Sequence, residues 1–153
     1  MIKQIIQNQY RSRIDQLIDI KTINRPNEGW IRTFRKALGM SGPQLAKRLN
    51  VSKSQTSQME RMEVEDRITL KQLRRVAEAL DCDLTYALVP RKPADEMIRD
   101  RANRKAAALV QKTDAHMKLE GQQLSKEILQ FQIEMETDRL LREMPRDLWD
   151  DIE

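Results

Sequence analysis

The chain has 153 residues, of which 34% are charged, and a formal net charge of +4. This length suits one ordinary domain, or a small domain with helical extensions, and excludes a large multidomain enzyme. No apolar run reaches the roughly 18–20 residues that a membrane-spanning helix needs. The first residues also lack the charged, apolar and small-residue regions of a secretory signal, so we expect a cytoplasmic protein.

The composition argues against an enzyme. One cysteine, Cys82, cannot form an internal disulfide, and one histidine, His116, has no second imidazole with which to bind a metal or activate a nucleophile. We therefore expect no catalytic site, no metal and no cofactor. Only four glycines and five prolines, among many Leu, Glu, Lys and Arg residues, favour a mainly α-helical fold.

The charge is unevenly distributed along the chain. Residues 30–61 contain seven bases and one acid, Glu60, whereas residues 114–153 contain eleven acids and five bases. A basic segment is typical of proteins that bind nucleic acid, and an acidic tail suits a protein partner. The alternative is that both segments are ordinary solvated helix surfaces.

The N-terminal part reads as one helix and a linker. Apolar residues recur every three or four positions over residues 2–23, which predicts an amphipathic helix. Pro26 and Gly29 then mark a linker. The predicted N-terminal region is therefore 1–29.

Ser or Thr stands three residues before Gln at three places in the central segment. In such a capping box the hydroxyl accepts the amide of the third helical residue, and Gln reaches back to the cap amide. The boxes predict three short helices, after an earlier one from Trp30 to about Leu38 that Gly39 ends. Together these helices define a domain over residues 30–90. The boxes occupy residues 40–45, 51–56 and 68–73 and predict helix starts at about 42, 53 and 70.

The region after this domain is also helical. Two prolines within residues 90–93 mark a break. Helical spacing of apolar residues predicts one helix through 98–117 and another through 124–141, with Gly121 between them. Residues 91–153 should therefore form a helical dimerisation or partner region.

The connection between two of the central helices is short. Only Asn50 and Val51 separate Leu49 from the cap Ser52. Two helices joined by such a turn have the geometry of a helix-turn-helix, whose second helix lies in a DNA major groove. The predicted core residues are Phe34, Leu38, Leu45, Ala46, Leu49, Val51, Met59, Ile68, Leu73, Val76, Ala77 and Leu80.

The exposed face of the helix over residues 53–61 carries side chains suited to DNA. Lys53, Ser54, Ser57 and Gln58 are base-reading candidates, since Gln pairs with adenine and Lys donates to guanine. Helix N-termini and cations suit phosphate oxygens. The turn, the caps and the local charge favour DNA binding over an ordinary solvent-facing helix. The predicted phosphate contacts are Arg32, Arg35, Ser41, Gly42, Gln44, Lys47, Ser52, Gln55, Arg61 and Arg67.

Four runs of the central segment match a known pattern: Leu45-Ala46, Leu49-Asn50-Val51-Ser52, Gln58-Met59-Glu60 and Leu73 to Leu80. Through them, residues 31–84 resemble the lambda-repressor-like (Xre/Cro) helix-turn-helix domain. The resemblance implies a five-helix, usually dimeric DNA-binding domain, in which Lys53, Ser54 and Gln58 match the base-reading positions. The loop after the recognition helix departs from that family. It lacks the usual glycine and proline and carries three acids, so Arg67 is the one phosphate contact expected there.

A narrower resemblance covers nearly the whole chain. The runs that carry it are Gly29-Trp30-Ile31-Arg32, Ala37-Leu38-Gly39-Met40-Ser41, Ile68-Thr69-Leu70, Leu73-Arg74-Arg75, Ala77 to Cys82, Tyr86 to Pro90, and His116-Met117 with Leu119-Glu120. Through these runs the chain is similar to the family called mobile mystery protein A, whose members are typically encoded beside a Fic-domain protein. The resemblance implies an antitoxin-like transcriptional regulator with a Fic toxin as its partner.

Glu120 with Gly121 is a candidate toxin contact. Fic inhibitors of one class carry Ser or Thr four residues before a Glu-Gly pair, so that the Glu occupies a nucleotide phosphate site. His116 stands at that spacing here, which departs from the motif. His116 and Glu120 are therefore candidate contacts, and the alternative is a solvated helix end and a helix-packing histidine.

One segment shows the alternation of a β-strand. Between Cys82 and Pro90, large apolar side chains stand at every second position, at Leu84, Tyr86 and Leu88, and alternate with Thr85, Ala87 and Val89. A lone strand needs an edge to pair with. We expect it to pair with the same strand of a second subunit in a twofold dimer, which requires a palindromic operator. The alternative is an ordinary fifth helix of the repressor fold.

These features together predict a mainly α-helical homodimer that binds double-stranded DNA. The expected function is sequence-specific transcriptional regulation by the antitoxin of a Fic-type pair, which represses its own operon. The alternative is a stand-alone or mobile-element repressor without a toxin. Plentiful carboxylates with no metal or nucleophile constellation argue against an enzyme.

Overall fold

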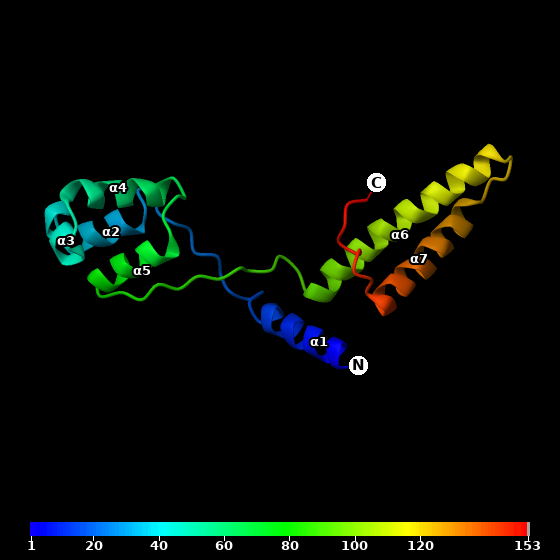
Figure 1. The fold of residues 1–153 in the computed structure, drawn as a ribbon, viewed down its shortest axis with the longest axis horizontal. Coiled ribbons are helices and arrows are strands. Elements are labelled where there is room, and N and C mark those ends of the chain that lie inside the picture. The colour runs from blue at the N-terminus through cyan, green and yellow to red at the C-terminus, as the bar shows by residue number, and fades with distance from the viewer. Residues whose placement is uncertain (153) are drawn as a thin grey trace. The chain divides into compact units, whose positions relative to one another are not determined.

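The computed structural model describes residues 1–152, and these residues form seven α-helices and no β-strand (Figure 1). The mainly α-helical prediction is therefore confirmed. None of the helices in this range is long and apolar enough to cross a membrane. The helices are α1 (Ile2–Asp15), α2 (Trp30–Ala37), α3 (Gly42–Leu49), α4 (Lys53–Val64), α5 (Leu70–Ala79), α6 (Ala94–Leu119) and α7 (Lys126–Glu143).

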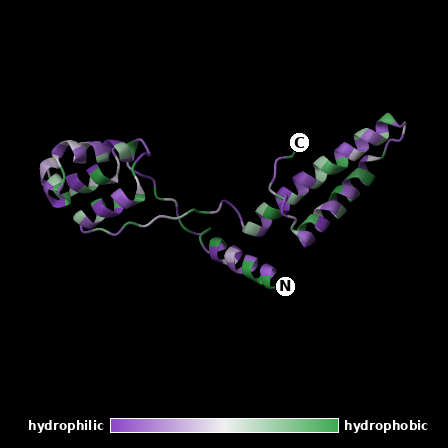
Figure 2. Cartoon of the chain, in the orientation of Figure 1, coloured by the Kyte–Doolittle hydropathy of each residue, from purple (hydrophilic) through white to green (hydrophobic). Residues whose placement is uncertain are grey.

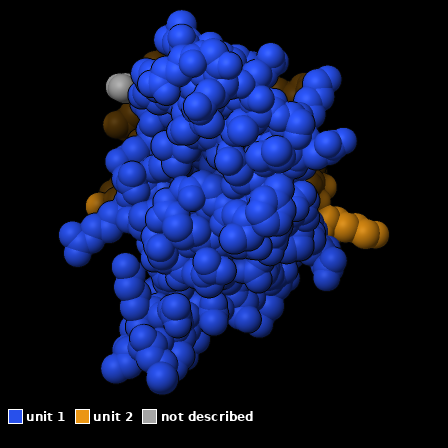
Figure 3. Space-filling model, turned by 90° about the vertical axis from the view of Figure 1, so that its right-hand side faces the viewer, with its two compact units in different colours: residues 1–20, 88–153 blue, residues 21–87 orange. Residues whose placement is uncertain are grey.

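The chain divides into two compact units, which Figure 3 colours separately. Unit 1 consists of residues 1–20 and 88–153 and contains α1, α6 and α7. Unit 2 consists of residues 21–87 and contains α2 to α5. Each unit has its own hydrophobic core.

The helices of unit 2 begin where the capping boxes predict. Ser41, Ser52 and Thr69 each accept a hydrogen bond from the amide of the Gln three residues later, at 3.1–3.3 Å. The side-chain oxygen of each Gln accepts from the cap amide, at 2.8–3.1 Å. The predicted end of α2 is also confirmed, since Gly39 has a φ of 65° and the next amide donates back to the Arg35 carbonyl at 2.8 Å.

The core of unit 2 agrees with the predicted set except on α2 and at Ala77 of α5, which is half-buried and lies outside the core cluster, where Ala79 packs instead. Phe34 and Leu38 were predicted inside but are 39% and 57% exposed. The reason is that α2 turns Ile31 and Arg35 inward instead, and Arg35 reaches a carboxylate on α4. Phe34 contacts the Trp30 ring, with 6.2 Å between the ring centroids. The buried cluster consists of Ile31, Leu45, Leu49, Val76 and Leu80.

The strand predicted at Leu84, Tyr86 and Leu88 is not supported. No amide between residues 83 and 92 donates a backbone hydrogen bond within residues 1–152. The alternative, a fifth helix, is also absent there, so unit 2 has four helices instead of the five that the resemblance implied. Alternating side chains do not suffice for a strand, which needs a backbone edge to pair with.

Unit 1 contains an antiparallel hairpin of α6 and α7 (Figure 1). Gly121 has a φ of 79° and ends α6, which confirms the predicted break. Ser125 caps α7 by accepting the Ile128 amide at 3.3 Å. Small side chains on α6 let α7 approach closely. The core residues of the hairpin are Ala102, Ala106, Leu140 and Leu148.

Helix α1 is shorter than predicted, because it ends at Asp15 and not near residue 23. The Asp15 carboxylate accepts the Ala94 amide at 2.9 Å, at the start of α6. Arg11 pairs with Asp95 at 2.9 Å. These polar contacts attach the C-terminal end of α1 to the N-terminus of α6.

Asp114 on α6 provides a test of the hairpin. It is 6% exposed, one carboxylate oxygen has no hydrogen-bond partner within residues 1–152, and the other pairs with Lys118 at 3.0 Å. A buried unpaired oxygen costs about 1–3 kcal/mol, more than such an ion pair contributes. We expect Asp114→Leu to raise the free energy of unfolding by about 1 kcal/mol in urea denaturation followed by circular dichroism. The control is Asp138→Leu, which replaces an exposed carboxylate and should not raise the free energy of unfolding. If Asp114→Leu lowers the free energy of unfolding, the unpaired oxygen of Asp114 does not destabilise the hairpin.

Candidate nucleic-acid interface

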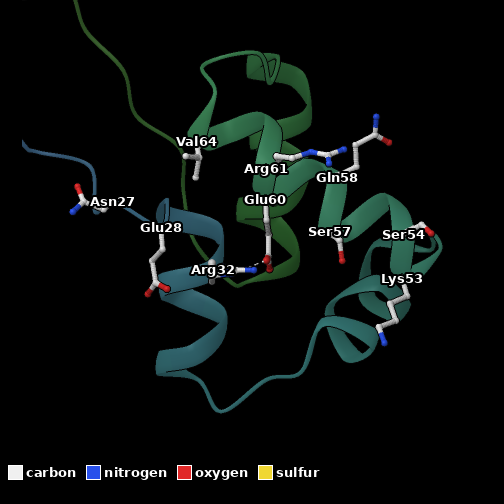
Figure 4. Close-up of a pocket in the computed structure, with 10 residues that line it drawn as sticks. All are labelled: Asn27, Glu28, Arg32, Lys53, Ser54, Ser57, Gln58, Glu60, Arg61 and Val64. Carbon is white, nitrogen blue, oxygen red and sulfur yellow. Dashed lines mark hydrogen bonds and ion pairs between the residues drawn. The ribbon is translucent and has the colours of Figure 1, made fainter.

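One face of α4 presents polar and cationic side chains to solvent (Figure 4). The helix begins where the sequence predicts but continues to Val64 instead of ending at residue 61. The structure brings all four base-reading candidates together along one groove, with one phosphate candidate from the same helix. These exposed α4 residues are Lys53, Ser54, Ser57, Gln58 and Arg61.

A buried carboxylate that also lines this groove joins α4 to α2. Glu60 is 6% exposed and accepts hydrogen bonds from Arg35 Nε at 2.6 Å and from Arg32 Nε at 3.1 Å. The hydrogen bond to Glu60 raises the pKa of the Arg35 guanidinium above its ordinary value. Arg35 therefore stays charged, and the hydrogen bonds of both arginines hold α2 against the helix that carries the base-reading candidates.

The two arginines differ in what they leave free for DNA. The Arg35 side chain is 15% exposed and also donates to the Met40 carbonyl. The Arg32 side chain is 49% exposed and lines the groove beside α4. Arg32 thus has donor groups facing the site, whereas the Arg35 guanidinium is occupied within the domain.

Glu63 on α4 caps the start of α2. It is 3% exposed, and its carboxylate accepts the backbone amides of Trp30 and Ile31, the latter at 3.2 Å. Helix α2 has no side-chain cap of its own, because Gly29 occupies its N-cap position. Gly29 has a φ of 84°, and a β-carbon there would lie 2.8 Å from a Glu63 oxygen. This close approach therefore requires glycine.

The linker before α2 is attached to the end of α4. Arg25 Nη1 donates to the Glu63 carbonyl and to the Asp66 carboxylate, each at 2.6 Å, and Nη2 donates to the Val64 carbonyl at 3.1 Å. The last carbonyls of a helix have no partner within it. Arg25 satisfies two of them, so the linker and α4 hold each other in place.

The turn between α3 and α4 sets how closely these helices pack. Asn50 adopts a left-handed conformation with a φ of 55°, and the Val51 amide donates to the Ala46 carbonyl at 3.0 Å. Ala46 is 4% exposed, so its small side chain lies where the two helices approach. This geometry agrees with the predicted helix-turn-helix.

Several phosphate candidates use their side chains for helix capping. Ser41 with Gln44 and Ser52 with Gln55 form the capping boxes at the starts of α3 and α4. Gly42 is the first residue of α3. The boxes use the amides of the cap residue and of the third helical residue, and Pro43 has no amide hydrogen. The amides left for a phosphate oxygen are therefore that of Gly42 in α3 and those of Lys53 and Ser54 in α4.

Many of the cations that make residues 30–61 basic already have an acidic partner. Lys36 pairs with Glu28 at 2.7 Å and Arg48 pairs with Asp81 at 3.3 Å. Beyond this segment, the phosphate candidate Arg67 pairs with Glu65 at 2.5 Å. The net charge of the segment therefore overstates the positive charge available to DNA. The bases over 30–61 that form no ion pair within residues 1–152 are Lys47 on α3 and Lys53 and Arg61 on α4.

Part of the linker borders the groove, which the sequence did not predict. Asn27 and Glu28 line it together with Arg32. Lys36 donates to Glu28 at 2.7 Å, and this hydrogen bond lowers the pKa of the Glu28 carboxyl. The groove therefore has a charged carboxylate at its edge at neutral pH, which disfavours a phosphate at that position.

The roles of Glu60 and Glu63 were also missed, although two signals were present. Gly29 provides no capping side chain for α2, so the acceptor must come from elsewhere in the chain. Residues three apart on a helix lie on the same face, which places both carboxylates together. The toxin-contact candidates, His116 and Glu120, are exposed at the end of α6 in unit 1.

Comparison with known families agrees with this geometry. Residues 31–86 match the family described as helix-turn-helix. With the capped helices, the tight turn and the exposed row on α4, this match identifies the segment as a helix-turn-helix DNA-binding domain, of the kind found in transcriptional regulators. It also fits the predicted lambda-repressor-like fold. No curated protein and no solved structure matches the chain.

The contact of Glu63 with the α2 amides can be tested by denaturation. We expect Glu63→Ala to lower the free energy of unfolding by about 1–3 kcal/mol, because it removes a helix cap and leaves buried amides unpaired. Chemical denaturation followed by circular dichroism measures this loss. Glu65→Ala removes a more exposed acid from the next turn and should change stability by less than about 0.5 kcal/mol. Equal effects of the two variants would contradict the capping role.

Proposed function

We propose that the protein is a sequence-specific transcriptional repressor whose helix α4 enters the DNA major groove. The observation that carries the proposal is the exposed row on α4, in which hydrogen-bonding and cationic side chains face one groove. The inner face of the same helix is bonded to α2 through buried carboxylates. A rigidly held helix lets side chains meet base edges without a further entropic cost of ordering them.

The side chains divide into base-reading and phosphate-binding groups. Gln58 suits an adenine edge, Lys53 suits the acceptors of guanine, and Ser54 and Ser57 suit either. Arg61, Arg32 and Lys47, with the free amides at the starts of α3 and α4, suit the phosphates on either side. The base-reading side chains would determine which DNA sequence is bound. The phosphate-binding groups would provide an affinity for DNA that falls as the salt concentration rises.

Substitutions on α4 test the proposed reading of bases. Lys53→Ala and Gln58→Ala should each weaken binding to the gene's own upstream DNA by about 1–3 kcal/mol, roughly 5- to 150-fold, and relax sequence choice. Fluorescence anisotropy with a labelled duplex measures both effects. Lys71→Ala is the matched control, because Lys71 is an exposed base on α5 outside the groove. Unchanged affinity in both α4 variants would contradict the assignment of α4.

We further propose that the protein acts as a homodimer on a palindromic operator. A twofold dimer presents two recognition helices about one DNA turn apart, roughly 34 Å. Half-sites at that spacing would multiply the modest affinity of a single domain. A footprint that covers one half-site only would contradict this arrangement.

We also propose that the repressor is the antitoxin of a Fic-type toxin and controls its own operon. The proposal is supported by the resemblance of its sequence runs to mobile mystery protein A and by the exposure of Glu120 at the end of α6. A Fic reading frame beside the gene favours this function. Its absence favours a stand-alone or mobile-element repressor.

Glu120 gives a direct test of toxin inhibition. Glu120→Ala should release a co-expressed Fic partner, because the carboxylate would no longer occupy the toxin's nucleotide phosphate site. Growth and modification of the toxin's targets are the measurements. Glu78→Ala, which removes an exposed acid from α5, should leave inhibition intact. If Glu120→Ala inhibits as well as the unchanged protein does, Glu120 is not the inhibitory group.

A further inference from the structure

Helix α1 faces α6 with its polar side. Its partly covered residues are Gln7, Arg11 and Asp15, at a spacing of four, and the last two contact the start of α6. None of the residues of α1 is buried. Because successive residues turn by about 100° around a helix, the opposite side carries the apolar residues. These are Ile2, Ile5, Ile6 and Tyr10, which are 75%, 52%, 45% and 65% exposed.

Such a helix is not stable on these contacts alone. An isolated helix shorter than about 12–15 residues is marginal in water, and most helices are stabilised by packing of their apolar face. The apolar face of α1 has no partner within residues 1–152, as its exposed fractions indicate. Figure 2 shows the hydrophobic residues of α1 in green between hydrophilic residues in purple. Packing of this face on a second surface would therefore stabilise α1.

Helix α7 carries a second exposed apolar row. Ile128, Phe131 and Met135 are 47%, 62% and 56% exposed. They are three and four positions apart and so lie on one side of the helix. The opposite side carries Leu140, which is buried against Ala102 and Ala106 of α6. The hairpin is thus complete without this row.

The two surfaces carry opposite charges that form no ion pair within residues 1–152. Lys3 and Arg13 are on α1, and Glu127 and Glu134 are next to the apolar row of α7. None of these four residues takes part in an ion pair within the described part of the chain, whose α1 and α7 pairs involve other residues. A basic apolar surface and an acidic apolar surface on one chain are complementary to each other.

The exposed area is large enough for a stable dimer. The two surfaces contain seven large apolar residues. If each has an accessible area of about 150–250 Å², the range of large side chains such as Phe and Tyr, the exposed part amounts to roughly 600–1,000 Å² per subunit. A standard interface buries about 800 Å² per partner.

We propose that α1 of one subunit packs on the Ile128–Met135 face of α7 in a second copy, and that a twofold axis repeats the contact. In a twofold dimer this contact occurs twice, because each subunit contributes one α1 surface and one α7 surface. A single interface would therefore cover both apolar surfaces of both subunits. The inference rests on the proposed homodimer but places its interface in unit 1, away from residues 84–88. It gives the otherwise unpacked α1 a structural role.

Sedimentation velocity of the full chain tests the interface. The unchanged protein should be a dimer at micromolar concentration. Ile6→Asp and Phe131→Asp should each raise the dissociation constant at least about tenfold, because each places a charge in the buried centre. Leu88→Asp is the matched control, since Leu88 is apolar and 90% exposed but outside both surfaces. Circular dichroism checks that the variants keep their helices.

Disulfide trapping tests the same contact without disturbing it. In a Cys82→Ser background, chains with Ile6→Cys are mixed with chains with Phe131→Cys and mildly oxidised. The expected product is a crosslink between the two different chains. A monomeric unchanged protein would overturn the homodimer and this interface together. A dimer that resists both Asp variants and gives no mixed crosslink, or that only Leu88→Asp dissociates, would overturn the interface alone.

Discussion

Two buried carboxylates on one helix hold the DNA-binding domain in its geometry. Glu60 bonds the side chains of Arg32 and Arg35, and Glu63 bonds the backbone amides at the start of α2. A buried carboxylate is costly unless each oxygen has donors, and here α2 provides them as guanidinium and amide groups. The inner face of α4 is thereby committed to structure, which leaves its outer face for DNA.

This arrangement also changes the electrostatic description of the domain. The segment over residues 30–61 is rich in bases, but Arg35 is mostly covered and Lys36 and Arg48 have acidic partners. The cations without an ion-pair partner within residues 1–152 are Lys53 at the start of α4 and Lys47 and Arg61 in the last turns of α3 and α4. In the proposed complex these three cations, and not the total charge, would provide the affinity for phosphate.

Unit 1 is organised by a different principle. Its hairpin buries small alanines of α6 against Leu140 and Leu148, while α1 is attached by polar groups at one end only. Apolar residues on α1 and on the outer side of α7 remain exposed. The proposed packing of α1 on α7 of a second copy would bury these residues and relate two helix-turn-helix domains by symmetry, as a palindromic operator requires.

The sequence by itself determined the starts of α3, α4 and α5, the glycine end of α2 and the row of polar residues on α4. These features depend on interactions within four or five residues, which local patterns record. Only the tertiary structure decided that Phe34 is outside and that Glu60 and Glu63 are inside. It also decided that no strand forms at residues 84–88 and that α1 ends at Asp15. Those outcomes depend on partners 25 to 84 positions away in the chain, or on a backbone edge that residues 1–152 do not provide.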